Sequence, residues 1–285
     1  MAIVKLPPLQ VNQRTLRRWI PPRQPNTHKG HYGKILLLCG AECYTGAPVL
    51  AAMGAARTGA GLIFVGVPKS VYSIVASKLV EPMVFPLPDE GGKLSARAIP
   101  QILERLNNCD ACLIGCGLGQ SEGTFEVVKA VLSHANCTVV LDADGINVLS
   151  SHIDILRDAV CPLILTPHGG EYARIGGDPR KGLDGAKALA KDLGITLVLK
   201  GHETLICGSA VYVNSCGNPG MATGGSGDVL AGIIVSLLGQ GLSPTKAAAA
   251  ACWLHGTAGD LCAEEIGQAG MLPTDLIQRL PRLLD

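Results

Sequence analysis

Apolar residues in this chain gather in short continuous runs instead of alternating with polar ones. The runs lie at 34–39, 62–67, 111–114, 138–141, 163–165 and 196–199. An uninterrupted run of this length, closed by glycine, proline or a polar residue, is typical of a strand buried on both faces. The chain is therefore expected to contain a central sheet that is covered on both sides.

Segments with helical character separate these runs and follow the last of them. We expect helices at 12–19, 46–60, 96–106, 124–134, 144–150, 184–193, 225–239, 244–263 and 272–279. Buried strands that alternate with helices predict a mainly parallel sheet between two helical layers, which is a three-layer α/β/α fold. In the C-terminal half, the runs 204–207 and 210–213 flank Gly208 and Ser209 and predict a hairpin with a two-residue turn.

The amino-terminal segment 1–28 is expected to be a lead-in to this domain. Its prolines oppose long regular elements; they are Pro7, Pro8, Pro21, Pro22 and Pro25. No linker of low complexity or strong charge divides the rest of the sequence, and no internal repeat is evident. The pattern therefore favours a single domain over residues 1–285.

Composition and charge argue against several classes of protein. Apolar residues make up 47% of the chain and charged residues 16%, which argues against a disordered protein. The formal net charge is +1 and aromatic residues are 4%, so nucleic acid is not an expected partner. No apolar run is long enough for a membrane-spanning helix and no secretory apolar region opens the sequence, so we expect a cytoplasmic protein with no membrane partner.

The 11 cysteines fit a reduced compartment. The spacing of Cys109, Cys112 and Cys116 could suggest a zinc or iron–sulfur site, but the usual second pair of ligands is missing. These cysteines lie in and beside the strand-like run 111–114, where cysteine behaves as a small apolar residue. We favour that apolar role.

The segment 218–230 carries the strongest indication of chemistry. In it Gly224, Gly225, Ser226 and Gly227 lead into a predicted helix. Successive glycines let backbone N–H groups face one concavity, and the helix start adds the positive end of its dipole, so an anion-binding site is expected here. Asp228 follows in the first helical turn, where it could cap the helix or take a proton from a hydroxyl that attacks a phosphoryl group. We favour the second role.

Further candidate loops follow predicted strands, at the sheet edge where α/β proteins bind ligands. The segment 200–204 could reach a nucleotide or form an ordinary polar turn. His168 and Glu171 would lie on the rim of the ligand site, with substrate contact favoured over metal binding. Asp142 and Asp144 could hold magnesium through water or cap the next helix.

Two phosphate-binding signatures are absent or weak. The sequence contains no Walker motif, and the loop 115–119 lacks the remaining spacing of a dinucleotide fingerprint. The glycines of that loop still allow a ligand to come close to the backbone.

The candidate loops together resemble a known family. The motifs are Lys29-Gly-x2-Gly33, Thr45-Gly-Ala-Pro48, Leu141-Asp-Ala-Asp-Gly145, Thr166-Pro-His168 with Glu171, Lys200-Gly-x2-Thr204 and Gly224-Gly-Ser-Gly-Asp228, in this order. This set resembles the ADP-dependent NAD(P)H-hydrate dehydratases, the carbohydrate kinase-like family of the YjeF type, over about residues 29–279. The resemblance implies the ribokinase-like form of the α/β/α fold. Family members are separate chains or are fused behind an epimerase domain, and a chain of 285 residues is expected to lack the epimerase half.

The resemblance implies a repair enzyme for damaged nicotinamide nucleotides. Such enzymes dehydrate the S form of NADHX or NADPHX to NADH or NADPH and convert ADP to AMP and phosphate; ATP is an alternative nucleotide. Mg²⁺ is the implied metal ion. The implied partners are these small molecules, a separate NAD(P)HX epimerase, and further copies of the chain in a homo-oligomer such as a tetramer.

The resemblance also implies roles for individual residues. Asp228 would handle the proton near the hydrate. The implied substrate contacts are Ala47, Gly117, Gly119, His168 and Asp228, and the implied nucleotide contacts are Lys200, Gly201, His202, Glu203, Thr204, Gly224, Gly225, Ser226 and Gly227. Asn214 and Asn218 match family positions near the phosphate loop, and no metal ligand is assigned.

The chain departs from the family pattern at a few positions. Cys116 stands where the family commonly has proline, Gly169-Gly170 replaces Pro-Gly, and Ser226 replaces threonine. These departures leave open how rigid the loops of the nicotinamide pocket are.

Two other functions share part of this pattern. A ribokinase-type, ATP-dependent small-molecule kinase would use Asp228 and the same glycine loop, which comprises residues 224–227. A non-catalytic nucleotide sensor would use this loop alone. The segment 200–204 and the Thr166-Pro-His168 motif favour the dehydratase over the kinase. The sensor would leave Asp228 without a purpose.

Overall fold

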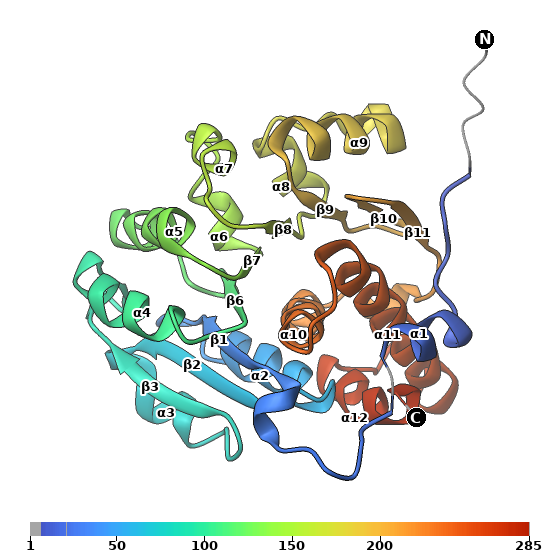
Figure 1. The fold of residues 1–285 in the computed structure, drawn as a ribbon, viewed down its shortest axis with the longest axis horizontal. Helices are drawn as coiled ribbons and strands as arrows, with labels where there is room; N and C mark the ends of the chain where they lie inside the picture. Colours follow the sequence, from blue (N-terminus) through green and yellow to red (C-terminus); the bar gives the residue numbers. More distant parts are fainter. Residues whose placement is uncertain (1–6, 21, 285) are drawn as a thin grey trace.

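The computed structural model describes residues 7–20 and 22–284; residues 1–6 and Pro21 of the predicted lead-in, and Asp285, lie outside the described residues. A nine-stranded sheet with the order β11-β10-β9-β8-β7-β6-β1-β2-β3 forms its centre (Figure 1). The strands are β1 Lys34–Leu38, β2 Leu62–Pro68, β3 Met83–Leu87, β6 Ala111–Ile114, β7 Thr138–Leu141, β8 Leu163–Leu165, β9 Thr196–Leu199, β10 Thr204–Cys207 and β11 Val211–Asn214. The sheet is parallel from β3 to β9, and β10 and β11 add an antiparallel hairpin at one edge. Strands β4 Asp89–Glu90 and β5 Lys93–Leu94 form a separate small hairpin.

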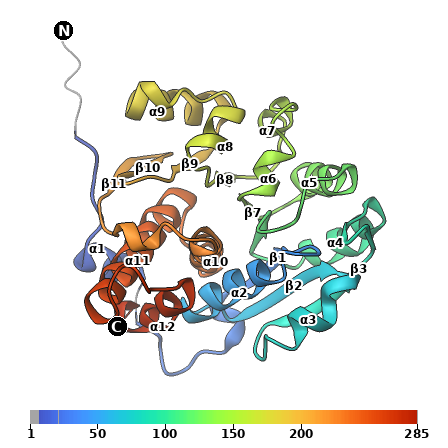
Figure 2. The same cartoon turned by 180° about the vertical axis from the view of Figure 1, so that it is seen from behind.

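Helices cover both faces of the sheet (Figures 1 and 2). One face carries α1 Gln13–Trp19, α2 Gly46–Arg57, α3 Tyr72–Ala76, α10 Ser226–Gly239, α11 Pro244–Glu265 and α12 Pro273–Leu284. The other carries α4 Ile99–Leu106, α5 Glu122–His134, α6 Asp144–Asn147, α7 Asp154–Arg157, α8 Gly169–Arg174 and α9 Gly182–Leu193. Short 3-10 turns complete the chain at Lys29–Tyr32, Lys69–Val71, Ala96–Ala98, Pro179–Lys181 and Pro219–Met221.

The continuous apolar runs become strands that feed two hydrophobic cores. In β1, Ile35 and Leu37 face the core beneath α2 and α10, whereas Leu36 and Leu38 face the core beneath α4 and α5. Successive side chains of a strand point to opposite faces, so a sheet buried on both faces needs apolar residues at every position. The expected three-layer α/β/α fold with a mainly parallel sheet is confirmed.

Helices α2 and α10 pack against each other through glycines. A Cβ atom at Gly54 would lie 2.9 Å from the carbonyl oxygen of Val229, and one at Gly232 would overlap the carbonyl oxygen of Ala51. The two backbones therefore approach more closely than side chains would allow. This contact fixes where the first turn of α10 lies relative to the sheet.

The lead-in crosses the hairpin edge of the sheet. Leu9 pairs with β11 through hydrogen bonds from Leu9 N to Val211 O (2.9 Å) and from Val213 N to Leu9 O (3.0 Å). Further along, the ring of Trp19 packs edge-on against Tyr212, with ring centroids 5.9 Å apart. Part of the lead-in thus protects an exposed strand edge, a role that its prolines did not indicate.

Some predicted details differ from the structure. Strand β3 was not expected; it holds Pro86, which is tolerated because β3 is an edge strand. The predicted two-residue turn is wrong, because residues 208–210 connect β10 to β11 and Cys207 pairs with Val211. The helix expected at 144–150 ends as α6 at Asn147. Within the described part of the chain, no helix combines the length and apolar character needed to cross a bilayer.

The close packing of α2 and α10 gives a test of the fold. Gly232→Ala should lower the free energy of unfolding by about 1–3 kcal/mol, because the new methyl group meets backbone that cannot rotate away. The cost of the clash should exceed the roughly 1 kcal/mol by which alanine is more favourable than glycine inside a helix. Urea unfolding measures the change. Gly270→Ala, where a Cβ atom would meet open space, is the matched control; equal stability of the two variants would contradict the packing argument.

Candidate functional site

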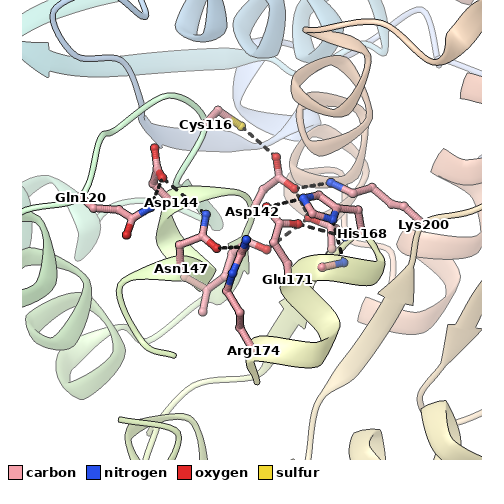
Figure 3. A network of polar contacts seen from close by, with 12 residues as sticks. Cys116, Gln120, Asp142, Asp144, Asn147, His168, Glu171, Arg174 and Lys200 are labelled. Carbon is pink, nitrogen blue, oxygen red and sulfur yellow. Dashed lines mark hydrogen bonds and ion pairs between the residues drawn. The ribbon is translucent and has the colours of Figure 1, made fainter. Parts of the chain in front are cut away.

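The candidate site lies where the carboxyl ends of the central strands meet the amino end of α10 (Figure 3). Cys116 follows β6, Asp142 follows β7, His168 follows β8 and Lys200 follows β9. These strands are neighbours in one parallel sheet, so residues that follow them arrive at the same edge. Asp228 reaches the same place from the first turn of α10.

The carboxylate of Asp142 is the centre of the polar contacts at this edge. It is 2% exposed. Its Oδ1 accepts hydrogen bonds from Thr166 Oγ1 at 2.6 Å and from Lys200 Nζ at 2.9 Å, and its Oδ2 accepts one from Cys116 Sγ at 3.6 Å. Burial opposes the charge of Lys200, but the attraction and hydrogen bond of Asp142 outweigh that cost, so the pKa of Lys200 is raised. The pair is therefore a buried ion pair.

The carboxylate of Asp228 lies beside this pair, and its pKa is raised above the ordinary value of an aspartate. Burial, followed by repulsion from Asp142, raises the pKa of Asp228 to about 6, while Cys116 and Lys200 act in the opposite direction. The sulfur of Cys116 and one carboxylate oxygen of each of Asp142 and Asp228 lie within 4.8 Å of one another. An acid with a pKa near 6 can accept a proton and give it back near neutral pH, which suits a general base.

Sequence alone allowed Asp228 to be a helix cap, but the structure shows no such contact. The residue at the cap position of α10 is Gly225, and no side chain makes a capping hydrogen bond there. The Asp228 carboxylate is directed instead to the cluster with Cys116 and Asp142.

The glycines that precede Asp228 serve different purposes. Gly225 has a φ of +95°, and a Cβ atom there would collide with Leu50 Cδ1. It is therefore required by the backbone and by packing against α2. At Gly224 a Cβ atom would meet open space, and at Gly227 it would lie 3.4 Å from Lys200 Nζ. Gly224 and Gly227 thus leave backbone accessible on the open side of the loop.

A cavity of about 700 Å³ opens on that side of the loop. Its wall includes most of the predicted nucleotide contacts, namely Lys200, Gly201, His202, Thr204, Gly224, Ser226 and Gly227, together with His168, Asn214 and Asn218. Glu203 and Gly225 do not line it. A second cavity of about 700 Å³, lined by residues including Lys34 and Arg105, lies at the amino ends of β1 and β2, away from the carboxylates. The two cavities have similar volumes, so the residues that line them, and not their size, distinguish the candidate site from the second cavity.

The cavity wall is held by residues of α11 that the sequence analysis did not select. Asp260 accepts hydrogen bonds from Gly217 N at 2.9 Å and from Asn218 Nδ2 at 3.1 Å. His255 Nε2 lies 3.2 Å from Ser226 Oγ. Burial lowers the pKa of His255 to about 4, so its ring is neutral at physiological pH. Both residues lie far along the chain from the glycine loop, and no local pattern marks them.

Three of the predicted substrate contacts, Ala47, Gly117 and Gly119, lie outside the cavity wall, whereas His168 is part of it. A Cβ atom at Gly117, whose φ is +62°, would be 2.8 Å from the Cβ of Ala47, so these two residues are adjacent. Asp144 Oδ2 accepts a hydrogen bond from Gly119 N at 2.9 Å. Asp142 and Asp144 therefore have different partners: one belongs to the ion pair, and the other fixes the loop 115–119.

His168 and Glu171 form a capping box at the start of α8. Gly170 N donates to His168 Nδ1 at 3.0 Å, and His168 N donates to Glu171 Oε2 at 2.9 Å. His168 is exposed at the cavity, as expected for a rim residue, but Glu171 is buried, so its predicted place on the rim is wrong.

The cysteines of the segment 109–116 divide into two kinds. Cys109 and Cys112 are buried in the apolar core beneath α4 and α5. Cys116 is also buried, but Figure 3 shows its sulfur directed at Asp142. The expected apolar role therefore misses the polar contact of Cys116, because sequence distance hides the proximity of Asp142 and Asp228.

Comparison with known proteins assigns this arrangement to a family. The family described as NAD(P)H-hydrate dehydratase matches residues 35–282. The chain is 43% identical over 276 residues to a bifunctional NAD(P)H-hydrate repair enzyme of Moorella thermoacetica, covering 94% of this chain and 52% of that protein. It is 37% identical over 269 residues to an ADP-dependent (S)-NAD(P)H-hydrate dehydratase of Neisseria meningitidis, covering 89% of this chain and 86% of that protein.

A solved structure agrees with these relatives. The ADP/ATP-dependent NAD(P)H-hydrate dehydratase of Bacillus subtilis, co-crystallised with ATP and Mg²⁺, superposes with a TM-score of 0.82 at 30% identity, covering 99% of this chain and 98% of that chain. The chain spans about half the length of the bifunctional relatives that it matches. On the family match and on these relatives, the chain belongs to the NAD(P)H-hydrate dehydratase family.

Proposed function

We propose that the protein repairs hydrated nicotinamide nucleotides. It dehydrates the S form of NADHX or NADPHX to NADH or NADPH and converts ADP to AMP and phosphate, with ATP as an alternative nucleotide. Membership of the family and the name of the Neisseria meningitidis relative support this activity. The observation that carries the proposal is a carboxylate with a pKa near 6, Asp228, at the amino end of a helix whose first residues line a cavity of about 700 Å³.

The proposed chemistry follows from the position of Asp228. Hydroxide is a poor leaving group, so the substrate hydroxyl is first phosphorylated. Asp228 takes the hydroxyl proton while the oxygen attacks the β-phosphorus of ADP; the new P–O bond forms as the bond to the α-phosphate oxygen breaks and AMP departs. The lone pair of the ring nitrogen then expels phosphate, and the departing phosphate takes the C5 proton, which restores the C5=C6 double bond.

The glycine loop is proposed to stabilise the charge that moves to the phosphoryl oxygens. The first N–H groups of a helix have no partners within the helix, and the dipole of α10 favours negative charge at the cavity that Ser226 and Gly227 line. Lys200 lines the cavity, and its ion pair with Asp142 holds it there. Nucleotide is thus proposed on the cavity side of Asp228, and the hydrate on the side of Ala47, Gly117 and Gly119, with His168 at the rim.

Mg²⁺ is proposed to enter with the nucleotide phosphates. The clustered side chains do not fit a dedicated magnesium site, because Asp142 already binds Lys200 and Thr166 and the third member of the cluster is a thiol. Magnesium prefers oxygen ligands and retains water when phosphates supply part of its shell. No step of the proposed chemistry is assigned to the ion.

Several wider features are also proposed. Residues 1–285 would act as one domain in the cytoplasm, where both nucleotides are made. The S form alone is the proposed substrate, so a separate epimerase would be needed to supply it from the R form. A homo-oligomer, with the tetramer as the first candidate, is the proposed assembly.

The direct test is recovery of NADH absorbance from chemically prepared NADHX. We expect NADH to appear only when ADP or ATP is added, with one AMP and one phosphate per NADH when ADP is the nucleotide. NADHX incubated without nucleotide is the control. A product that keeps the transferred phosphate would support the alternative kinase, and nucleotide binding without any turnover would support the sensor.

Asp228→Asn should abolish most turnover, by about 10²-fold or more, because the amide cannot accept the hydroxyl proton. Binding of ADP should persist, since the glycine loop is unchanged; isothermal titration calorimetry measures it. The Asp260→Asn variant tests the cavity wall, because Asp260 holds Gly217 and Asn218 in that wall and does not touch Asp228. Near-wild-type turnover of Asp228→Asn would show that another group handles the proton.

The pH dependence should report the same carboxylate. A general base works only when deprotonated, and burial raises the pKa of Asp228 to about 6. Turnover should therefore be nearly constant above pH 7 and fall about tenfold per pH unit well below pH 6. Measurement of kcat/KM for the hydrate against pH checks this, because kcat/KM reports the groups of the enzyme before the hydrate binds. A limb centred near pH 4, the ordinary range of an aspartate, would contradict the proposed environment.

A further inference from the structure

The thiol of Cys116 lies close to the carboxylates of Asp142 and Asp228 but has no part in the proposed chemistry. Its sulfur is 3.6 Å from Asp142 Oδ2. The sulfur and one carboxylate oxygen of each of Asp142 and Asp228 lie within 4.8 Å of one another. The residue is 0% exposed. Figure 3 shows the side chain directed from the end of β6 towards the centre of the polar network.

The backbone fixes this thiol firmly. Gly115 and Gly117 on either side have φ values of +137° and +62°, and a Cβ atom at Gly115 would overlap the carbonyl oxygen of Asp142. Gly40 N donates to the carbonyl oxygen of Cys116 at 2.9 Å. The exits of β1, β6 and β7 are therefore packed together, and the side chain at position 116 has little freedom to turn away.

The surroundings keep the thiol protonated. A hydrogen bond with Cys39, burial and the nearby carboxylates all raise the pKa of Cys116 well above its ordinary value. A neutral thiol is a weak donor, and its natural acceptors here are carboxylate oxygens. A donor that points at a carboxylate favours the ionised form of that carboxylate.

We propose that Cys116 is a positioning residue whose single S–H is shared between the carboxylates of Asp142 and Asp228 and keeps Asp228 ionised and directed at the reacting hydroxyl. The groups that face Asp228 are Asp142 after β7, which opposes its ionisation, and Lys200 after β9 and Cys116 after β6, which favour it. Lys200 is already paired with Asp142, whereas the S–H of Cys116, which bonds to Asp142 Oδ2 in this structure, lies within 4.8 Å of an Asp228 oxygen and can turn to it. The catalytic meaning of this role rests on the proposed function, but the contact itself does not.

The test is direct titration of the Asp228 carboxyl by NMR of protein labelled with ¹³C-aspartate, with its signal assigned from Asp228→Asn. In Cys116→Ala the midpoint should rise by about half a pH unit, because a donor to the ionised form is lost. Cys116→Ser, which keeps a donor, should return the midpoint towards that of the wild type. Cys112→Ala removes an equally buried thiol on β6 that has no carboxylate contact, and it should leave the midpoint unchanged.

A midpoint that is unchanged or lowered in Cys116→Ala, or one that serine does not restore, would overturn the donor role. Turnover then separates this role from the proposed function. The acid limb of kcat/KM for the hydrate in Cys116→Ala should move to higher pH by the same amount, with KM for ADP little altered, whereas a merely structural role would lower kcat/KM equally at every pH. If the midpoint moves but the wild type shows no nucleotide-dependent NADH recovery, the proposed function fails and the donor role stands.

Discussion

The ion pair between Asp142 and Lys200 is the interaction on which the site depends. One carboxylate at the end of β7 binds the lysine that follows β9, the threonine that follows β8 and the thiol that follows β6. Four strand exits are thus joined at a single buried group. Removing one partner of a buried pair leaves an uncompensated charge, which is costly, so these exits have one favourable arrangement.

The same pair sets the electrostatics of Asp228. Lys200 carries a positive charge to the cavity wall, but Asp142 already neutralises most of it. Asp228 therefore meets burial and a negative neighbour with little compensation, which is why its pKa is raised to about 6. A carboxylate in this state costs stability at neutral pH, and proteins keep such costs at positions where they are useful.

Packing of α10 places Asp228 beside these charges. The glycine contacts with α2 bring the first turn of α10 over the strand exits, where Asp228 lies beside Asp142 and the glycine loop lines the cavity. On the cavity side, α11 fixes the wall through Asp260 and His255. On the other side, Asp144 fixes the loop that holds Gly119. Two groups of loop residues therefore meet at one carboxylate, which suits the proposed transfer between two bound molecules.

The sequence by itself determined the architecture and the main elements of the site. Continuous apolar runs required a sheet buried on both faces, and the glycine-rich approach to Asp228 marked the helix start, because both signals are local. The three-residue turn after Cys207, the edge strand with Pro86, the burial of Glu171 and the parts played by Cys116, His255 and Asp260 were decided only by the tertiary structure. Their chemistry depends on which distant segments become neighbours and on how much water those neighbours exclude. A local sequence pattern indicates neither.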